Sequence, residues 1–186
     1  MIQTKQKGFT LIELLVVIAI LTVLPLVVVS DFPRIRLQFA LSRVAHTFAQ
    51  DLRNTQDMAL SSTDFTDQFG VPQPISGYGI FVDMAAQDKQ YIIYADAYPG
   101  NRQYDQLDFV VKTINLATDE PGVVIKDVVN TENQQASINF IPPNPDIDIT
   151  QLTGLNRSVD VVFALETDAA VTKTVSINTA GLIEVK

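Results

Sequence analysis

The first pattern along the chain is a long apolar run. Residues 9–29 contain one charged side chain, Glu13. As an α-helix rising about 1.5 Å per residue, this run would extend about 31 Å, which matches the hydrocarbon core of a bilayer. Lys5 and Lys7 precede the run and Asp31 follows it. Because positive charge stays on the cytoplasmic side, we expect a membrane-spanning helix at 9–29 with its N-terminus in the cytoplasm.

A helical pattern continues after the apolar run. From Ile35 onward, apolar residues recur at spacings of three and four, which predicts a helix with one buried face. We expect this stem, residues 30–62, to end near Ser61 and to cover a sheet. A free amphipathic helix lying on a membrane is the alternative. Pro25 and Pro33 are expected to kink or locally open the helix. The predicted buried face consists of Leu37, Leu41, Val44, Phe48, Leu52, Thr55 and Ala59.

The hydrophobic period changes to two in the remaining chain. Residues 63–74 are rich in turn formers and predict a loop, and short alternating segments separated by Gly, Asn and Pro follow. The fold class is therefore α+β: a long N-terminal helix, first transmembrane and then amphipathic, packed on a small antiparallel β-sheet or sandwich at 63–186. The predicted strands are Gly79–Asp83, Gln90–Ala95, Phe109–Leu116, Val123–Val129, Ala136–Ile141, Ser158–Glu166, Lys173–Asn178 and Leu182–Val185.

Composition narrows the possible functions. The 186 residues allow one modest domain and an N-terminal element, and the formal net charge is −8. Such an acidic surface repels phosphate backbones and disfavours unspecific binding to nucleic acid. The chain has no cysteine, which excludes a thiolate zinc site, a cysteine nucleophile and disulfides.

The stretch KGFTLIELLVVIAIL carries a more specific signal. It resembles the leader junction of type IV pilins and type II secretion pseudopilins. In that family a prepilin peptidase cuts after the glycine, here Gly8, and methylates the new first residue, here Phe9. The glutamate at the fifth mature position corresponds to Glu13. A cleaved secretory signal, a plain signal anchor, a buried core helix and a stray interfacial acid were the alternatives, and none explains both Glu13 and the Gly-Phe junction.

The resemblance also gives Glu13 a physical role. A carboxylate inside a bilayer costs a few kcal/mol unless it finds a partner. Cleavage after Gly8, which removes the leader 1–8, creates an amine on Phe9 at the same depth. The amine of one subunit is expected to meet Glu13 of its neighbour in a growing filament, so docking relieves the unpaired charge.

Further segments are similar to minor pseudopilins of the GspH/FimT type. They are SGYGIFVD, DLRNTQDMAL, INFIPPNP and KTVSINTAGLIEV. The resemblance implies a long helix packed on two small antiparallel sheets. Some relatives bind DNA through a basic C-terminal patch, but the tail GLIEVK has no arginine pair. Loss of the leader would leave 11 basic and 21 acidic side chains, a net charge of −10. No nucleic-acid partner is expected.

One loop collects candidate metal ligands. Asp96, Asn101, Asp105 and Asp108 offer the oxygen atoms that calcium prefers, but their spacing does not match an EF-hand. We expect a solvated hairpin loop here, and another polar loop at 146–148. The single histidine, His46, is expected to be structural, and the tyrosines at 91, 94, 98 and 104 are expected to pack rather than stack on bases. No cofactor is predicted.

The sequence thus predicts a minor pilin or pseudopilin that catalyses nothing. Its expected partners are the prepilin peptidase, other pilin or pseudopilin subunits, the inner-membrane assembly platform and membrane lipid. It would be a single-pass inner-membrane protein with an extracytoplasmic domain at 63–186, later part of a type IV pilus or a type II secretion pseudopilus. A membrane-anchored binding module that does not polymerise is the alternative.

Overall fold

The computed structural model describes residues 8–61, 64–67, 69–143 and 146–186, without the side chains of 26–31 and 146. Most of the predicted leader, residues 1–7, lies outside the described residues. The chain divides into two units, Met1–Arg36 and Leu37–Lys186. The long helix α1, Leu11–Leu60, contributes residues to both of them.

The second half of α1 has the buried face that its sequence predicts. Of the seven predicted face residues, six are buried and Leu37 is half-buried. Alanines at 40, 45 and 49 are also buried and extend this face. The helix ends at Leu60, one residue before the predicted end. It remains helical through Pro25 and Pro33, so the expected local opening is not observed.

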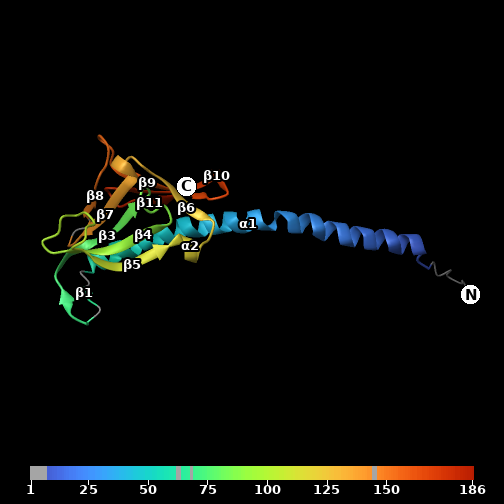
Figure 1. The fold of residues 1–186 in the computed structure, drawn as a ribbon, viewed down its shortest axis with the longest axis horizontal. Coiled ribbons are helices and arrows are strands. Elements are labelled where there is room, and N and C mark those ends of the chain that lie inside the picture. Colours follow the sequence, from blue (N-terminus) through green and yellow to red (C-terminus); the bar gives the residue numbers. More distant parts are fainter. Residues whose placement is uncertain (1–7, 62–63, 68, 144–145) are drawn as a thin grey trace, which may run out of the picture. The chain divides into compact units, whose positions relative to one another are not determined.

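Within the described residues, the strands form two antiparallel sheets and a separate short hairpin (Figure 1). One sheet has the order β5-β4-β3-β7-β8 and the other has the order β11-β10-β9-β6, while β1 pairs with β2 alone. The α+β prediction is therefore confirmed. The strands are β1 Phe65–Thr66, β2 Pro72–Gln73, β3 Ile75–Asp83, β4 Gln90–Ala97, β5 Phe109–Asn115, β6 Val123–Val129, β7 Gln135–Ile141, β8 Asp146–Ile149, β9 Ser158–Leu165, β10 Asp168–Asn178 and β11 Ile183–Val185.

The eight predicted strands are all present, β6 with its predicted bounds and the other seven with shifted ends, and two predicted loops contain further structure. The predicted loop 63–74 contains β1 and β2. The predicted polar loop 146–148 is part of β8, because Ile147 and Ile149 alternate with Asp148 and are buried against β7. Two short helices, α2 at Leu116–Asp119 and η1 at Glu132–Gln134, complete the fold. Asn115 ends β5 and begins α2 by accepting a hydrogen bond from the backbone N–H of Ala117 at 2.9 Å.

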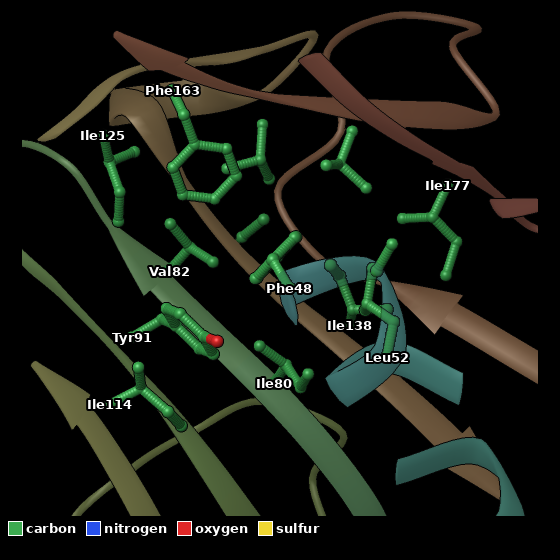
Figure 2. Close-up of a cluster of buried hydrophobic side chains, with 14 of the residues drawn as sticks. Phe48, Leu52, Ile80, Val82, Tyr91, Ile114, Ile125, Ile138, Phe163 and Ile177 are labelled. Carbon is green, nitrogen blue, oxygen red and sulfur yellow. The ribbon is translucent and has the colours of Figure 1, made fainter. Parts of the chain in front are cut away.

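The hydrophobic core lies between α1 and the two sheets. Figure 2 shows side chains from α1, from β3 to β5 and from β6, β7, β9 and β10 pointing toward one another. Phe48 of α1 is fully buried and makes edge-on contacts with Tyr91 of β4, at 4.9 Å between ring centroids, and with Phe163 of β9, at 5.4 Å. One helical side chain therefore packs against both sheets.

Polar contacts join α1 to strand β4 of the five-stranded sheet and to the end of α2. The buried Tyr91 donates its hydroxyl proton to a carboxylate oxygen of Asp51 at 2.6 Å, and burial is the main cause that raises the pKa of this tyrosine. Arg43 pairs with Glu120 through two hydrogen bonds. Because the Tyr91 hydroxyl would otherwise be buried without a partner, the Asp51 bond favours one register of the helix on the strands.

Gly77, near the start of β3, is required because the backbone of β7 approaches it closely. A side-chain carbon at this position would lie 2.5 Å from the carbonyl oxygen of Phe140. We therefore expect Gly77→Ala to lower the free energy of unfolding by about 1–3 kcal/mol, since the strand pair must separate to admit a methyl group. Urea unfolding of the full chain, followed by circular dichroism, measures this change. Gly154→Asn is the control, because nothing lies within 4 Å of Gly154 and asparagine tolerates its φ of +63°. Equal stability of both variants would contradict the expected clash.

Candidate processing and assembly site

The junction at Gly8 and Phe9 lies outside the helix. Residues 8–10 have no regular secondary structure, and α1 begins at Leu11. Gly8 is exposed, with nothing within 4 Å of its would-be side chain, and the side chain of Phe9 is 86% exposed. A peptide bond within a helix must unwind before a peptidase can hydrolyse it. The Gly8–Phe9 bond is accessible without that step.

Glu13 is held by Thr10 at the start of α1. The backbone N–H and the hydroxyl group of Thr10 each donate a hydrogen bond to Oε2 of Glu13 at 2.9 Å. The backbone N–H of Glu13 donates in return to the hydroxyl oxygen of Thr10 at 3.3 Å. Thr10 precedes the first helical residue and Glu13 is the third, so the two residues form a capping box. The carboxylate thus satisfies donors that the helix end leaves free.

The segment after this cap exposes many large apolar side chains. Leu11 is 81% exposed and Leu21 is 64% exposed, and nine further large apolar side chains from Ile12 to Leu24 are also exposed. A contiguous surface of this kind requires cover by lipid or by other protein. No helix within the described residues combines the length and the apolarity of a membrane span. The span predicted at 9–29 includes 26–29, whose side chains lie outside the description, and it stays a prediction.

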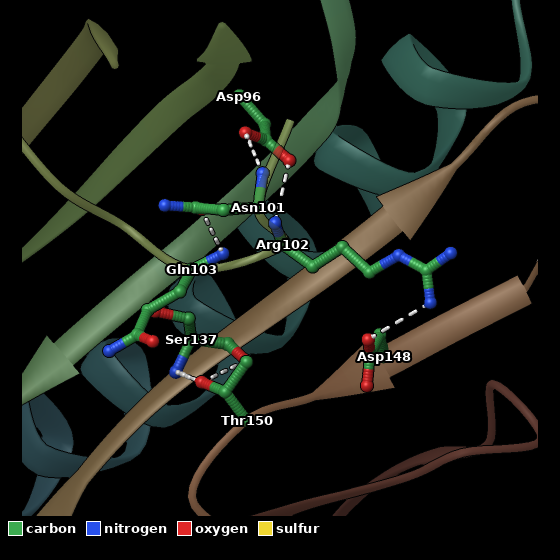
Figure 3. Close-up of polar contacts among 7 residues, drawn as sticks. All are labelled: Asp96, Asn101, Arg102, Gln103, Ser137, Asp148 and Thr150. Carbon is green, nitrogen blue, oxygen red and sulfur yellow. Dashed lines mark hydrogen bonds and ion pairs between the residues drawn. The ribbon is translucent and has the colours of Figure 1, made fainter. Parts of the chain in front are cut away.

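The candidate metal ligands lie together at the end of β4, which holds Asp96, and in the loop from β4 to β5, which holds the other three. Their side chains form hydrogen bonds within this segment. Asp96 accepts hydrogen bonds from the backbone N–H groups of Asn101 and Arg102, at 3.3 and 3.0 Å (Figure 3). Asp108 accepts bonds from the backbone N–H groups of Ala97 and Asp105, at 2.9 and 2.8 Å. The side-chain amide of Asn101 donates to Asp105 at 2.6 Å. The four predicted ligands therefore stabilise the conformation of this segment through hydrogen bonds within it.

The electrostatics of this loop reflect burial. Asp96 is buried, and burial is the main cause that raises its pKa above the ordinary range, with a further rise from the nearby negative charge of Asp108. Burial likewise raises the pKa of Asp108. Among the described residues, no group of three or more His, Cys, Asp or Glu side chains is arranged to hold a metal ion.

The same loop folds against the outer face of the five-stranded sheet. The backbone N–H of Tyr104 donates to the hydroxyl of Ser137 on β7 at 3.1 Å, and its ring stacks on Phe81 of β3 at 4.9 Å. Arg102 pairs with Asp148 of β8 at 3.4 Å (Figure 3). The sequence pattern predicts none of these three contacts, because each joins residues more than twenty positions apart.

Of the other sequence candidates, Tyr94 and Tyr104 have their rings in contact, with the ring centroids 5.1 Å apart. Tyr91 and Tyr94 are buried in the sheet, Tyr104 packs against it, and Tyr98 is exposed at 71%. These four side chains therefore do not form one stacking platform. His46 is exposed on α1.

Sequence reasoning also missed Thr10. Its signal was present, since the order Thr-x-x-Glu directly before an apolar run is the signature of a capping box.

Comparison with known proteins addresses the N-terminal segment. The family described as the prokaryotic N-terminal methylation motif matches residues 3–24, a range that includes Gly8, Phe9, Thr10 and Glu13. The match supports a type IV pilin-like family and a processed subunit of the pilin or pseudopilin type. It implies processing by a prepilin peptidase and assembly with other pilins, and it suggests a membrane-anchored pilin. The GspH/FimT type is not confirmed by this match. Comparison with curated proteins and with solved structures gives no match.

Proposed function

We propose that this protein is a minor pilin or pseudopilin with no catalytic activity. A prepilin peptidase cuts it after Gly8 and methylates the amine of Phe9, and the mature chain enters a type IV pilus or a type II secretion pseudopilus. One observation carries this proposal. The methylation motif at residues 3–24 coincides with an exposed, non-helical Gly8–Phe9 bond directly before a capped helix.

The two parts of the chain have different roles in this proposal. The apolar helix from Phe9 spans the inner membrane before assembly, and afterwards it packs among the helices of other subunits. The exposed apolar side chains of this segment support that role, because both environments cover them. The β-rich domain lies outside the cytoplasm and presents its surface to partner subunits of the filament and to the assembly platform.

Intact-mass analysis of the membrane-extracted protein tests the processing step. The full chain is expressed with and without a prepilin peptidase. With the peptidase, we expect a chain that begins at Phe9 and carries one additional methyl group, because the motif presents both the cut site and the new amine. Without the peptidase, the chain should begin at Met1. A chain that begins at Met1 in both samples would show that the junction is not processed, and Glu13 would then need another explanation.

A further inference from the structure

The residues just beyond the apolar run form a basic and aromatic segment of α1. This exit segment consists of Phe32, Pro33, Arg34, Ile35 and Arg36 and is helical throughout. All five side chains are exposed, including the large apolar side chains of Phe32 and Ile35. The exit segment therefore combines apolar surface with two positive charges.

Neither arginine of the exit segment has an acidic partner in the described part of the chain. Four ion pairs are found there, and none includes Arg34 or Arg36. The guanidinium carbon of Arg36 lies over the ring of Phe32, 5.8 Å from the ring centroid. A guanidinium that rests on an aromatic face keeps its N–H donors at its edges, and their planar arrangement matches the oxygens of a phosphate group.

Removal of the leader would change the charge at the two ends of the apolar run. Lys5 and Lys7 are lost, which leaves the two arginines of the exit segment as the only basic side chains in residues 9–42. Residues 31–36, with Asp31 included, carry a net charge of +1, whereas the mature chain as a whole carries −10. An anionic surface repels the rest of the chain, so any attraction to such a surface comes from this segment.

The position of the exit segment along the helix matches the depth of lipid headgroups. In the proposed function, the apolar helix from Phe9 spans the membrane, and the apolar run ends at Val29. At about 1.5 Å per residue, residues 32–36 lie roughly 5–10 Å beyond Val29, where the headgroup region of a bilayer is found. Aromatic rings are enriched at this depth, and arginine side chains can extend from it to phosphate groups.

We infer that Arg34 and Arg36 bind the phosphate groups of anionic phospholipids in the extracytoplasmic leaflet before the subunit enters a filament. This inference rests on the membrane span of the proposed function, and it adds a preference for one class of lipid. Phe32 holds the guanidinium of Arg36 at the level of the headgroups. A net charge of +1 near an anionic surface corresponds to a preference of about fivefold.

Tryptophan fluorescence in vesicles tests this preference. The chain has no tryptophan, so Phe32→Trp places a single reporter in the exit segment and keeps an aromatic ring beside Arg36. The full chain with this substitution is reconstituted in vesicles of phosphatidylcholine that contain a minority of phosphatidylglycerol. Each lipid in turn carries bromine on its acyl chains near the headgroup, because brominated lipid quenches only a tryptophan that it contacts.

We expect phosphatidylglycerol to quench the tryptophan about fivefold more per mole than phosphatidylcholine does. High salt should weaken this preference, since it screens exposed charges. Replacement of both arginines, by Arg34→Gln and Arg36→Gln, should abolish it. Arg53→Gln is the matched control, because Arg53 is also exposed on α1 but lies in the second unit, and this variant should keep the full preference.

Three outcomes would overturn the inference. Equal quenching per mole by the two lipids would show that the exit segment does not select anionic lipid, and poor entry of the doubly substituted chain into filaments would then assign the arginines to an acidic partner subunit. A preference that survives the double substitution, or that Arg53→Gln removes equally, would belong to another part of the chain. Quenching by neither lipid would place the exit segment outside a membrane, and the membrane span of the proposed function would then also be wrong.

Discussion

The Glu13→Ala variant is expected to be inserted and processed normally but to be reduced at least about tenfold in filaments. In the proposed filament, the substitution removes the acceptor for the amine of Phe9 on the neighbouring subunit, and a charge left unpaired in an apolar setting costs several kcal/mol. Because the exposed Gly8–Phe9 bond is unchanged, the cut by the peptidase should not depend on this carboxylate. Immunoblots of sheared filaments and of membranes, together with intact mass, measure both effects.

Thr22→Ala is the matched control for this experiment. Thr22 is also a polar residue in the apolar run, but its hydroxyl bonds to the carbonyl oxygens of Ile18 and Ala19 in its own helix. We expect its removal to leave the filament fraction unchanged. If Glu13→Ala instead kept both localisation and function, the chain would be a membrane-anchored binding module that does not polymerise.

The Phe48→Ala variant is expected to lose about 3–5 kcal/mol of unfolding free energy. Phe48 is fully buried and contacts Tyr91 and Phe163, which belong to different sheets, so its removal leaves a cavity where α1 and both sheets meet. The surrounding side chains cannot fill this space without moving α1 away from one of the two sheets. Urea unfolding of the full chain, followed by circular dichroism, gives the change directly.

His46→Ala is the control for this substitution. It lies two residues away on the same helix, its side chain is exposed, and its removal should change stability by less than about 0.5 kcal/mol. Comparable losses in both variants would indicate that the effect belongs to the helix in general and not to the core contact.

The long helix and most strands were predictable from hydrophobic period alone. Leu41, Val44 and Leu52 recur at helical spacing, and a helix that covers a sheet must bury such a face, so pattern and burial agree. Strands such as β6 and β9 alternate over part of their length and are bounded by turn residues. In both cases the same spacing of apolar residues recurs several times along one element. A single residue that departs from this spacing therefore does not change the predicted helix or strand.

Other features depend on contacts that a local pattern does not contain. β8 has only four residues, and the aspartates beside Ile147 favoured a loop until pairing with β7 was known. The carboxylates of Asp96 and Asp108 had the composition of a cation site, but the backbone turns of their own loop use them as acceptors. At the candidate site, the motif indicated Gly8, Phe9 and Glu13, whereas the preference for a single oxygen of Glu13 required atomic positions.

The packing of α1 against both sheets has a mechanical consequence. Val44, Phe48 and Leu52 lie along one face of the helix and are buried together, over more than two helical turns. A pull along the helix axis loads these contacts in parallel, as shear, because sliding the helix must displace every buried side chain at once. Peeling, in which contacts break one after another, would need a force across the helix. A subunit built in this way resists tension along its own stem better than tension from the side.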